Sequence, residues 1–184
     1  MKIGDQFWLK ENLRCTSYSD GTPIPRVQGN NWGTYSAGAY CYYGEDSTTA
    51  HIYGYLYNYS AAAHGNLCPP GWHVPSIDEW NTLIAYAGGS TVAGGKLRQK
   101  GRMFWGTTES CVTDEYGFSA LPGGIRGPGN TSFSIKDKGF WWSATSYNNN
   151  YADVCTIASN GCNIINTDPA EKHCGCSIRC VKDN

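Results

Sequence analysis

Long hydrophobic runs are missing from this chain of 184 residues. No stretch approaches the roughly 18 consecutive apolar residues that a membrane-spanning helix needs. The opening Met1-Lys2-Ile3-Gly4-Asp5 also lacks the apolar core of a signal peptide. We therefore expect no direct membrane insertion and no sorting signal in this chain.

Charge of one sign is equally scarce. The chain has 14 Lys and Arg against 15 Asp and Glu, which gives a net charge of −1, and it contains no basic run. Nucleic-acid backbones are bound by clustered Lys and Arg, so we expect no nucleic-acid partner. Charged residues make up only 16% of the chain, whereas aromatics reach 14% and glycines number 23. This balance favours one turn-rich β or α+β domain over a helical bundle.

The short motifs of common enzymes and metal sites are missing too. Neither Gly-x-Ser-x-Gly nor His-Glu-x-x-His occurs to position a nucleophile or a zinc-bound water. Asp153, Asp168 and Glu171 offer oxygens, but they do not follow the spacing of a calcium loop. His73, between Trp72 and Val74, is expected to be a hydrogen-bonded structural residue. We predict no catalytic residues, no metal site and no cofactor.

Cysteine, in contrast, is abundant: nine residues, more than is usual in a cytosolic protein of this length. Secreted domains use cysteines as disulfide staples, and an odd count leaves at least one thiol free or bonded to another chain. The one tight cluster, Cys174-Gly175-Cys176 with His173 and Cys180, lacks the second Cys-x2-Cys half of a zinc site. For these cysteines we favour structural disulfides and inert thiols, and the alternative is a role in metal binding or redox chemistry.

The two ends of the chain carry patterns typical of strands. Residues 2–9 place Ile3, Phe7 and Leu9 on one face, as in a half-buried strand, and residues 177–181 alternate in the same manner. We expect the two terminal strands to be neighbours in one sheet. Such a pairing closes the domain on itself.

Two helices are predicted between the ends. Ser76 and Glu79 have the spacing of a capping box, apolar residues then recur at helical intervals, and Gly88-Gly89 provides a left-handed stop. A shorter helix is expected within residues 54–64, ended by Gly65.

Two further strands are predicted at residues 117–126 and 139–145. The second contains Trp141 and Trp142, and alternation along a strand predicts that only one of the pair faces inward. The other is then available to line a ligand surface.

An ordered set of motifs resembles a known family. These are Gly4-x3-Trp8-Leu9-x-Glu11-Asn12-Leu13, Asp20-Gly21-Thr22-Pro23, Tyr53-Gly54-x-Leu56-Tyr57-Asn58, Cys68-Pro69-x-Gly71-Trp72-His73-Val74-Pro75-Ser76, Glu79-Trp80, Ala93-Gly94-Gly95, Trp141-Trp142-Ser143 and Ser177-x-Arg179-Cys180-Val181. Together they resemble the Fibrobacter succinogenes major paralogous domain along essentially the whole chain.

The resemblance implies a C-type-lectin-like fold of the α+β class. Such a fold has two short helices flanking a small, mainly antiparallel sheet, adjacent terminal strands and long irregular loops. It implies one domain over residues 1–184, with a ligand-binding lobe at about 141–176, and a place at the cell surface or outside the cell. Lectin-like folds also suggest a Cys68–Cys180 disulfide, and we further expect Cys155 to pair with Cys162.

The same resemblance suggests where a ligand binds. The superfold includes variable proteins of diversity-generating retroelements, in which Asn codons of the C-terminal lobe are randomised around fixed aromatic residues. Tyr and Asn are effective contact residues because they combine rigid area with adaptable hydrogen bonds. The candidate contacts are Tyr147, Asn148, Asn149, Asn150, Tyr151, Asp153, Thr156, Asn160, Asn163, Asn166 and Trp142.

The expected function is non-enzymatic binding or adhesion to a protein or glycan on another cell or particle. Three alternatives stay open. The Asn-rich stretch is also explained by the needs of turns, since Asn favours loops. The second alternative is a structural surface module without a specific ligand. The third is a cysteine-dependent oxidase related to formylglycine-generating enzymes, with Cys174 and Cys176 as the candidate reactive cysteines.

Overall fold

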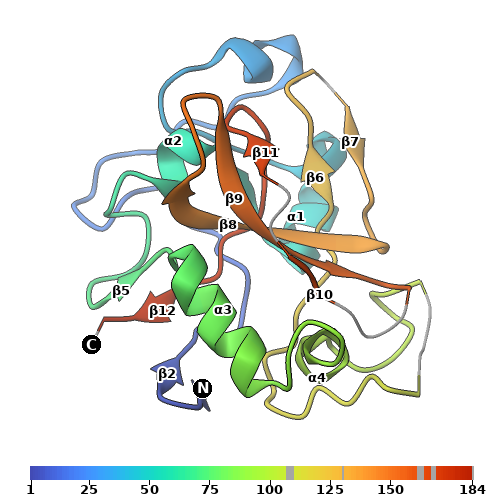
Figure 1. The fold of residues 1–184 in the computed structure, drawn as a ribbon. Coiled ribbons are helices and arrows are strands. Elements are labelled where there is room, and N and C mark those ends of the chain that lie inside the picture. Colours follow the sequence, from blue (N-terminus) through green and yellow to red (C-terminus); the bar gives the residue numbers. More distant parts are fainter. Residues whose placement is uncertain (107–109, 130, 161–163, 167–168, 184) are drawn as a thin grey trace.

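The computed structural model describes residues 1–106, 110–129, 131–160, 164–166 and 169–183. These parts form a mixed α/β fold with four α-helices and several small antiparallel sheets (Figure 1). The expectation of an α+β class is confirmed at this level. The helices are α1 (Ser47–Tyr53), α2 (Tyr59–Ala62), α3 (Ile77–Tyr86) and α4 (Ala93–Leu97), with 3-10 turns at Gly29–Thr34 and Tyr43–Glu45. The strands are β1 (Lys2–Ile3), β2 (Gln6–Phe7), β3 (Tyr40–Cys41), β4 (Leu56–Tyr57), β5 (Trp72–His73), β6 (Ile125–Arg126), β7 (Ser132–Phe133), β8 (Lys138–Ser146), β9 (Tyr151–Ala158), β10 (Ile164–Asn166), β11 (Ala170–Glu171) and β12 (Val181–Lys182).

The long β8–β9 hairpin organises the molecule. Its strands pair antiparallel from Lys138 opposite Ala158 to Trp142 opposite Val154, and the register shifts beyond Trp142. Strands β10 and β11 add to the outer side of β9. Helices α2 and α3 lie against the hairpin, whose tip projects beside α2 (Figure 1). The predicted strand at 139–145 is therefore confirmed.

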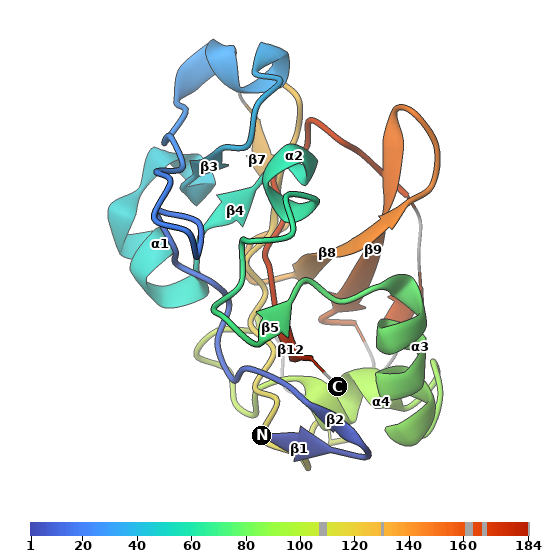
Figure 2. The same ribbon diagram turned by 90° about the vertical axis from the view of Figure 1, so that its left-hand side faces the viewer.

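The two ends of the chain meet, as predicted (Figure 2). Trp8 forms an antiparallel bridge with Val181, and the Leu9 amide donates to the Cys180 carbonyl at 3.0 Å. Residues 2–9 are nevertheless not one strand, because the chain reverses at Gly4 and Asp5 to form the β1–β2 hairpin. This turn leaves Phe7 43% exposed and buries Trp8 in its place.

The predicted Cys68–Cys180 disulfide is present, with the two Cα atoms 6.1 Å apart. It joins the segment before β5 to the segment before β12, where these two strands pair. The Cys155–Cys162 pairing is wrong, because Cys155 is a free thiol buried on β9. Cys162 lies outside the described residues. Cys111 also belongs to a disulfide, which the sequence did not predict.

Helix α3 begins and ends where the sequence predicts. The Ser76 hydroxyl accepts from the Glu79 amide at 3.2 Å, while the Glu79 carboxylate accepts from the Ser76 amide at 2.7 Å. These bonds satisfy two amides that a helix start leaves without partners. Trp80 and Leu83 are buried, and the chain leaves the helix through Gly88, whose φ of 104° favours glycine.

The helix expected within residues 54–64 is much shorter. Only Tyr59–Ala62 is helical, because Leu56 and Tyr57 extend into β4 between β3 and Cys176. The Asn58 side chain begins α2 by accepting from the Ala61 amide at 3.1 Å. Helix α1 was not predicted, although Asp46 caps it by accepting from the Thr48 amide at 2.9 Å.

Candidate functional site

The tip of the β8–β9 hairpin, residues 147–150, is held by its own backbone and by one side chain. The amide oxygen of Asn148 accepts from the backbone amides of Asn150 and Tyr151, both at 2.9 Å. The Tyr147 amide donates to the Tyr151 carbonyl at 3.1 Å. Asn148, predicted as a ligand contact, thus shapes the turn, a role for which Asn is well suited.

A second segment, residues 170–173, lies beside this tip. Glu171 on β11 is the register partner of Tyr151, and the Lys172 amide donates to the Asn150 carbonyl at 2.9 Å. The ammonium group of Lys172 donates to the Asn148 carbonyl at 2.7 Å and lies 5.1 Å from the centre of the Tyr59 ring on α2. These contacts tie the tip to the segment after β11 and to α2.

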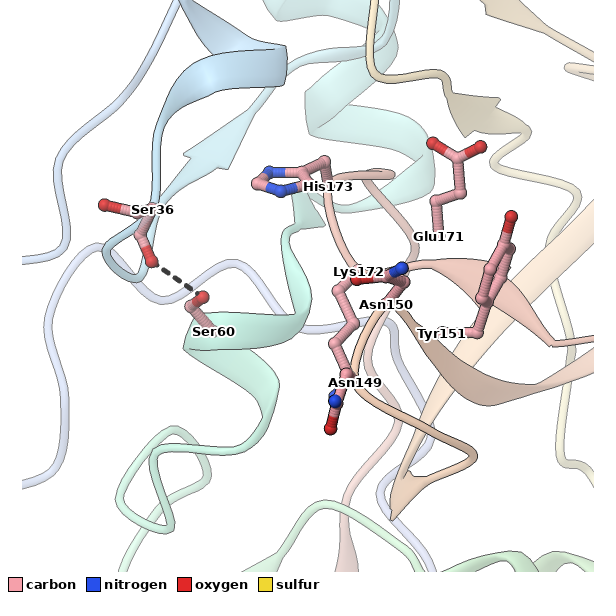
Figure 3. Close-up of a pocket in the computed structure, with 8 residues that line it drawn as sticks. All are labelled: Ser36, Ser60, Asn149, Asn150, Tyr151, Glu171, Lys172 and His173. Atoms are coloured by element: carbon pink, nitrogen blue, oxygen red, sulfur yellow. Dashed lines mark hydrogen bonds between the residues drawn. The ribbon is translucent and has the colours of Figure 1, made fainter.

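Between these elements lies a pocket of about 460 Å³, which we call the tip pocket. Pockets for small molecules usually span about 300–1,000 Å³. Figure 3 shows the Tyr151 ring and the Glu171 carboxylate extending in the same direction, with Ser36 and Ser60 across from them. The Ser60 hydroxyl donates to the Ser36 carbonyl at 2.9 Å, which holds the loop before β3 against α2.

Three predicted contacts line the tip pocket: Asn149, Asn150 and Tyr151. Tyr147 is 63% exposed on the same tip but does not line the pocket. Sequence reasoning did not assign the other lining residues to a ligand site; they are Ser36, Ser60, Glu171, Lys172 and His173. They come from three separate segments, and no local pattern in the sequence indicates that these segments meet.

Other predicted contacts lie away from this pocket. Asp153 is half-buried on β9, where burial raises the pKa of its carboxyl, and Thr156 is buried further along the strand. Asn160 is exposed beyond the opposite end of β9, roughly 25 Å from the tip at the usual rise of a strand. Asn166 ends β10 opposite Cys155. Asn163 lies outside the described residues.

Trp142 does not reach the surface, so its prediction as a ligand contact is wrong. Both Trp141 and Trp142 are fully buried. The two faces of β8 are both covered: Trp141 packs near Trp80 of α3, with ring centres 6.4 Å apart, and Trp142 packs against Tyr59 of α2 at 5.4 Å. Alternation along the strand therefore does not expose either ring.

The cysteines near the C-terminus lie in surroundings that suppress thiolate chemistry. Cys174 and Cys176 are buried, and burial raises the pKa of Cys174 to about 11 and that of Cys176 well above its usual value. A reactive thiol needs the opposite shift, since the thiolate is the nucleophile. Within the described ranges, no group of three His, Cys, Asp or Glu side chains is placed to hold a metal ion.

Fold and site together define a small α+β protein whose hairpin tip presents a polar pocket. The chain belongs to the Fibrobacter succinogenes major domain family, whose model matches residues 1–182. The resemblance carried by the motifs is thus confirmed along nearly the whole chain. No curated protein and no solved structure matches it. Among the residues that the structure describes, no helix has the length and apolarity required to cross a bilayer.

Proposed function

We propose that this chain is a non-enzymatic binding module whose ligand occupies the tip pocket. One observation carries the proposal. The tip backbone is fixed because the Asn148 side chain accepts from backbone amides and the Lys172 ammonium group donates to a backbone carbonyl. The exposed side chains of Asn149 and Asn150 line the pocket beside the half-exposed Tyr151. Side chains displayed on a fixed backbone are suited to binding, because little conformational freedom is lost when a ligand arrives.

We also propose that the fold is C-type-lectin-like. Three features support this: the pairing of Trp8 with Val181 at the two ends of the chain, the Cys68–Cys180 disulfide, and long irregular stretches between short strands. The disulfides are consistent with a place at the cell surface or outside the cell. The ligand then belongs to another cell or particle.

The tip further suits a protein diversified by a retroelement. Asn149 and Asn150 are exposed, and the tip hydrogen bonds described above involve the backbone of Asn150 but the side chain of neither residue. Replacement of these side chains is therefore compatible with the fold. A reverse-transcriptase gene and a near-copy of the 3′ coding segment beside the gene would support this part of the proposal; a neighbourhood without both would contradict it.

The binding proposal is tested by comparing the wild-type protein with a variant that combines Asn149→Ala, Asn150→Ala, Tyr151→Ala and Glu171→Ala. Both proteins are screened against glycan arrays and against displayed surface proteins of other cells. Asn160→Ala, at the far end of β9, is the matched control. We expect the combined variant to keep its melting temperature and lose binding, while the control binds normally. Unchanged binding by the combined variant would overturn the assignment of the site.

A further inference from the structure

Resting on this proposed function, we infer that the ligand of the tip pocket is a short neutral oligosaccharide. One apolar face of a sugar ring stacks on Tyr151, and the ring hydroxyls bond to Asn149, Asn150 and Glu171. The inference draws on four properties of the pocket: its polar lining, its charge, its single aromatic ring and its size.

The polar lining matches a ligand covered with hydroxyl groups. A hydroxyl both donates and accepts, so it is best bound by groups that do the same or that occur in pairs. Asn149 and Asn150 each offer an amide with donors and an acceptor, the Glu171 carboxylate offers two acceptors, and Ser60 adds a hydroxyl. A fatty or extended aromatic ligand would leave these groups without partners, which is costly once water is displaced.

The charge of the pocket selects a neutral ligand. Lys172 is the one lysine or arginine among the eight residues that line it. Its ammonium group is directed toward the hairpin tip, because it donates to the Asn148 carbonyl at 2.7 Å and faces the Tyr59 ring. Glu171 and Lys172 are neighbours of opposite charge in this lining, so the pair offers no excess of positive charge that would select a phosphate, sulfate or uronic acid.

The aromatic ring supplies the apolar contact that a sugar also requires. Tyr151, at the start of β9, is the one tyrosine, tryptophan or phenylalanine that lines the pocket, and it is 36% exposed. A pyranose ring has a face of C–H groups that packs on the face of such a ring. The phenol oxygen remains available for a hydrogen bond.

The size and the composition of the pocket disfavour a protein as the ligand. A stable protein interface buries about 800 Å² per partner and has an apolar centre depleted of charged residues. Here the concave surface encloses about 460 Å³, and apart from Tyr151 its lining is polar or charged. A few sugar rings fill such a volume, whereas a flat protein surface would pass over the pocket without filling it.

The experiment begins with a panel of neutral oligosaccharides prepared from plant and microbial polysaccharides, presented on an array to the whole chain. The best binder is then titrated by calorimetry against single variants. Tyr151→Ala is expected to weaken binding roughly tenfold, as loss of the stacking contact implies. Tyr151→Phe keeps the ring and should retain most of the affinity, and Tyr147→Ala is the matched control, since this tyrosine lies on the same tip but outside the pocket.

The outcomes separate the ligand class from the site. Binding of a neutral oligosaccharide that is lost in Tyr151→Ala and kept in Tyr147→Ala supports the inference. If tip variants abolish binding to a protein partner and no neutral sugar binds or competes, the saccharide is wrong while the proposed function stands. If only anionic sugars bind, the neutral saccharide is likewise wrong and the proposed function stands. If sugars bind equally to wild type and to Tyr151→Ala, the saccharide inference fails, and the proposed function fails with it only if the combined tip variant also keeps its binding to every partner.

Discussion

The guanidinium group of Arg179 donates to the side-chain amide oxygen of Asn12 at 2.9 Å, although the two residues lie at opposite ends of the chain. Both side chains are buried. The same oxygen accepts from the Trp141 indole at 2.8 Å, and the Asn12 amide nitrogen donates to the Tyr53 carbonyl at 2.8 Å. Arg179 also donates to the Phe118 carbonyl at 2.7 Å. One buried amide thus connects the opening segment, α1, β8 and the closing segment.

Replacing this amide should destabilise the protein strongly. We expect Asn12→Ala to lower the free energy of unfolding by about 2–4 kcal/mol, because it leaves the Trp141 indole, the Tyr53 carbonyl and part of Arg179 buried without a partner. Urea unfolding measures the loss. Asn149→Ala, an exposed position on the tip, should change stability by less than about 0.5 kcal/mol. Equal stability of the two variants would contradict this role of Asn12.

His73 should make stability depend on pH. Its Nε2 lies 2.8 Å from Glu79 and its Nδ1 lies 2.6 Å from Asp183. Burial lowers the pKa of His73, but hydrogen bonds and charges of Asp183 and Glu79 outweigh it, and the net pKa is raised. The stabilisation is complete below the unfolded pKa of about 6.5 and is lost as pH rises through the higher folded value.

We therefore expect the wild-type protein to be more stable at pH 6 than at pH 9 relative to His73→Gln. The difference should be about 1 kcal/mol, since both ion pairs are partly exposed. Chemical denaturation at several pH values gives the comparison. Asp183→Asn should remove part of the effect. A pH dependence that is the same in wild type and His73→Gln would show that this histidine contributes nothing.

The Cys68–Cys180 disulfide should contribute much of the stability. It closes a loop with a sequence separation of 112 residues, for which the chain-entropy model gives about 4–5 kcal/mol. We expect the Cys68→Ser, Cys180→Ser double variant to unfold at a much lower urea concentration than the oxidised wild type. Wild-type protein kept in a strong reductant should unfold at the urea midpoint of the variant or below it, because the disulfide of Cys111 is reduced as well. A midpoint unaffected by either change would contradict the model.

Gly139 on β8 should not accept a side chain. A Cβ atom there would lie 2.2 Å from the Trp141 ring, which is itself enclosed in the core. Gly139→Ala is expected to cost about 2–3 kcal/mol, because the ring has no room to move. Gly106→Ala is the control, since its nearest neighbour to such an atom is 3.6 Å away. Thermal unfolding of the two variants compares them, and similar melting temperatures would refute the clash.

The free thiols should react more slowly the more deeply they are buried. Cys15 is half-buried, whereas Cys41, Cys155, Cys174 and Cys176 are buried, and burial raises the pKa of Cys41 to about 12. We expect iodoacetamide to modify Cys15 first in the native protein, because both access and thiolate formation limit the others. Peptide mapping by mass spectrometry identifies the order. Rapid modification of Cys174 or Cys176 would revive the oxidase alternative.

Local signals predicted local structure well. The start of α3 is predicted correctly, because the capping box of Ser76 and Glu79 is formed by residues only three positions apart. The hairpin at residues 2–7 and strand β4 were not predicted, because their conformations depend on partners distant in sequence. Leu56 and Tyr57 are extended since β3 and Cys176 pair with them on either side.

The candidate site was predicted only in part for the same reason. Asn149, Asn150 and Tyr151 were found because turn-forming, Asn-rich composition marks an exposed hairpin tip. Ser36, Ser60 and Lys172 carry no such mark, since they join the tip only through tertiary contacts. The burial of Trp142 was missed because α2 covers the second face of β8, and alternation within one strand does not report what lies above it.

The bond from the Lys172 ammonium group to the carbonyl of Asn148 has a consequence for evolution. A carbonyl group is common to all residues, so this anchor survives whatever amino acids stand at positions 149 and 150. Substitutions at those positions leave this anchor in place, so chains that differ there can inherit the same loop shape while they present different side chains.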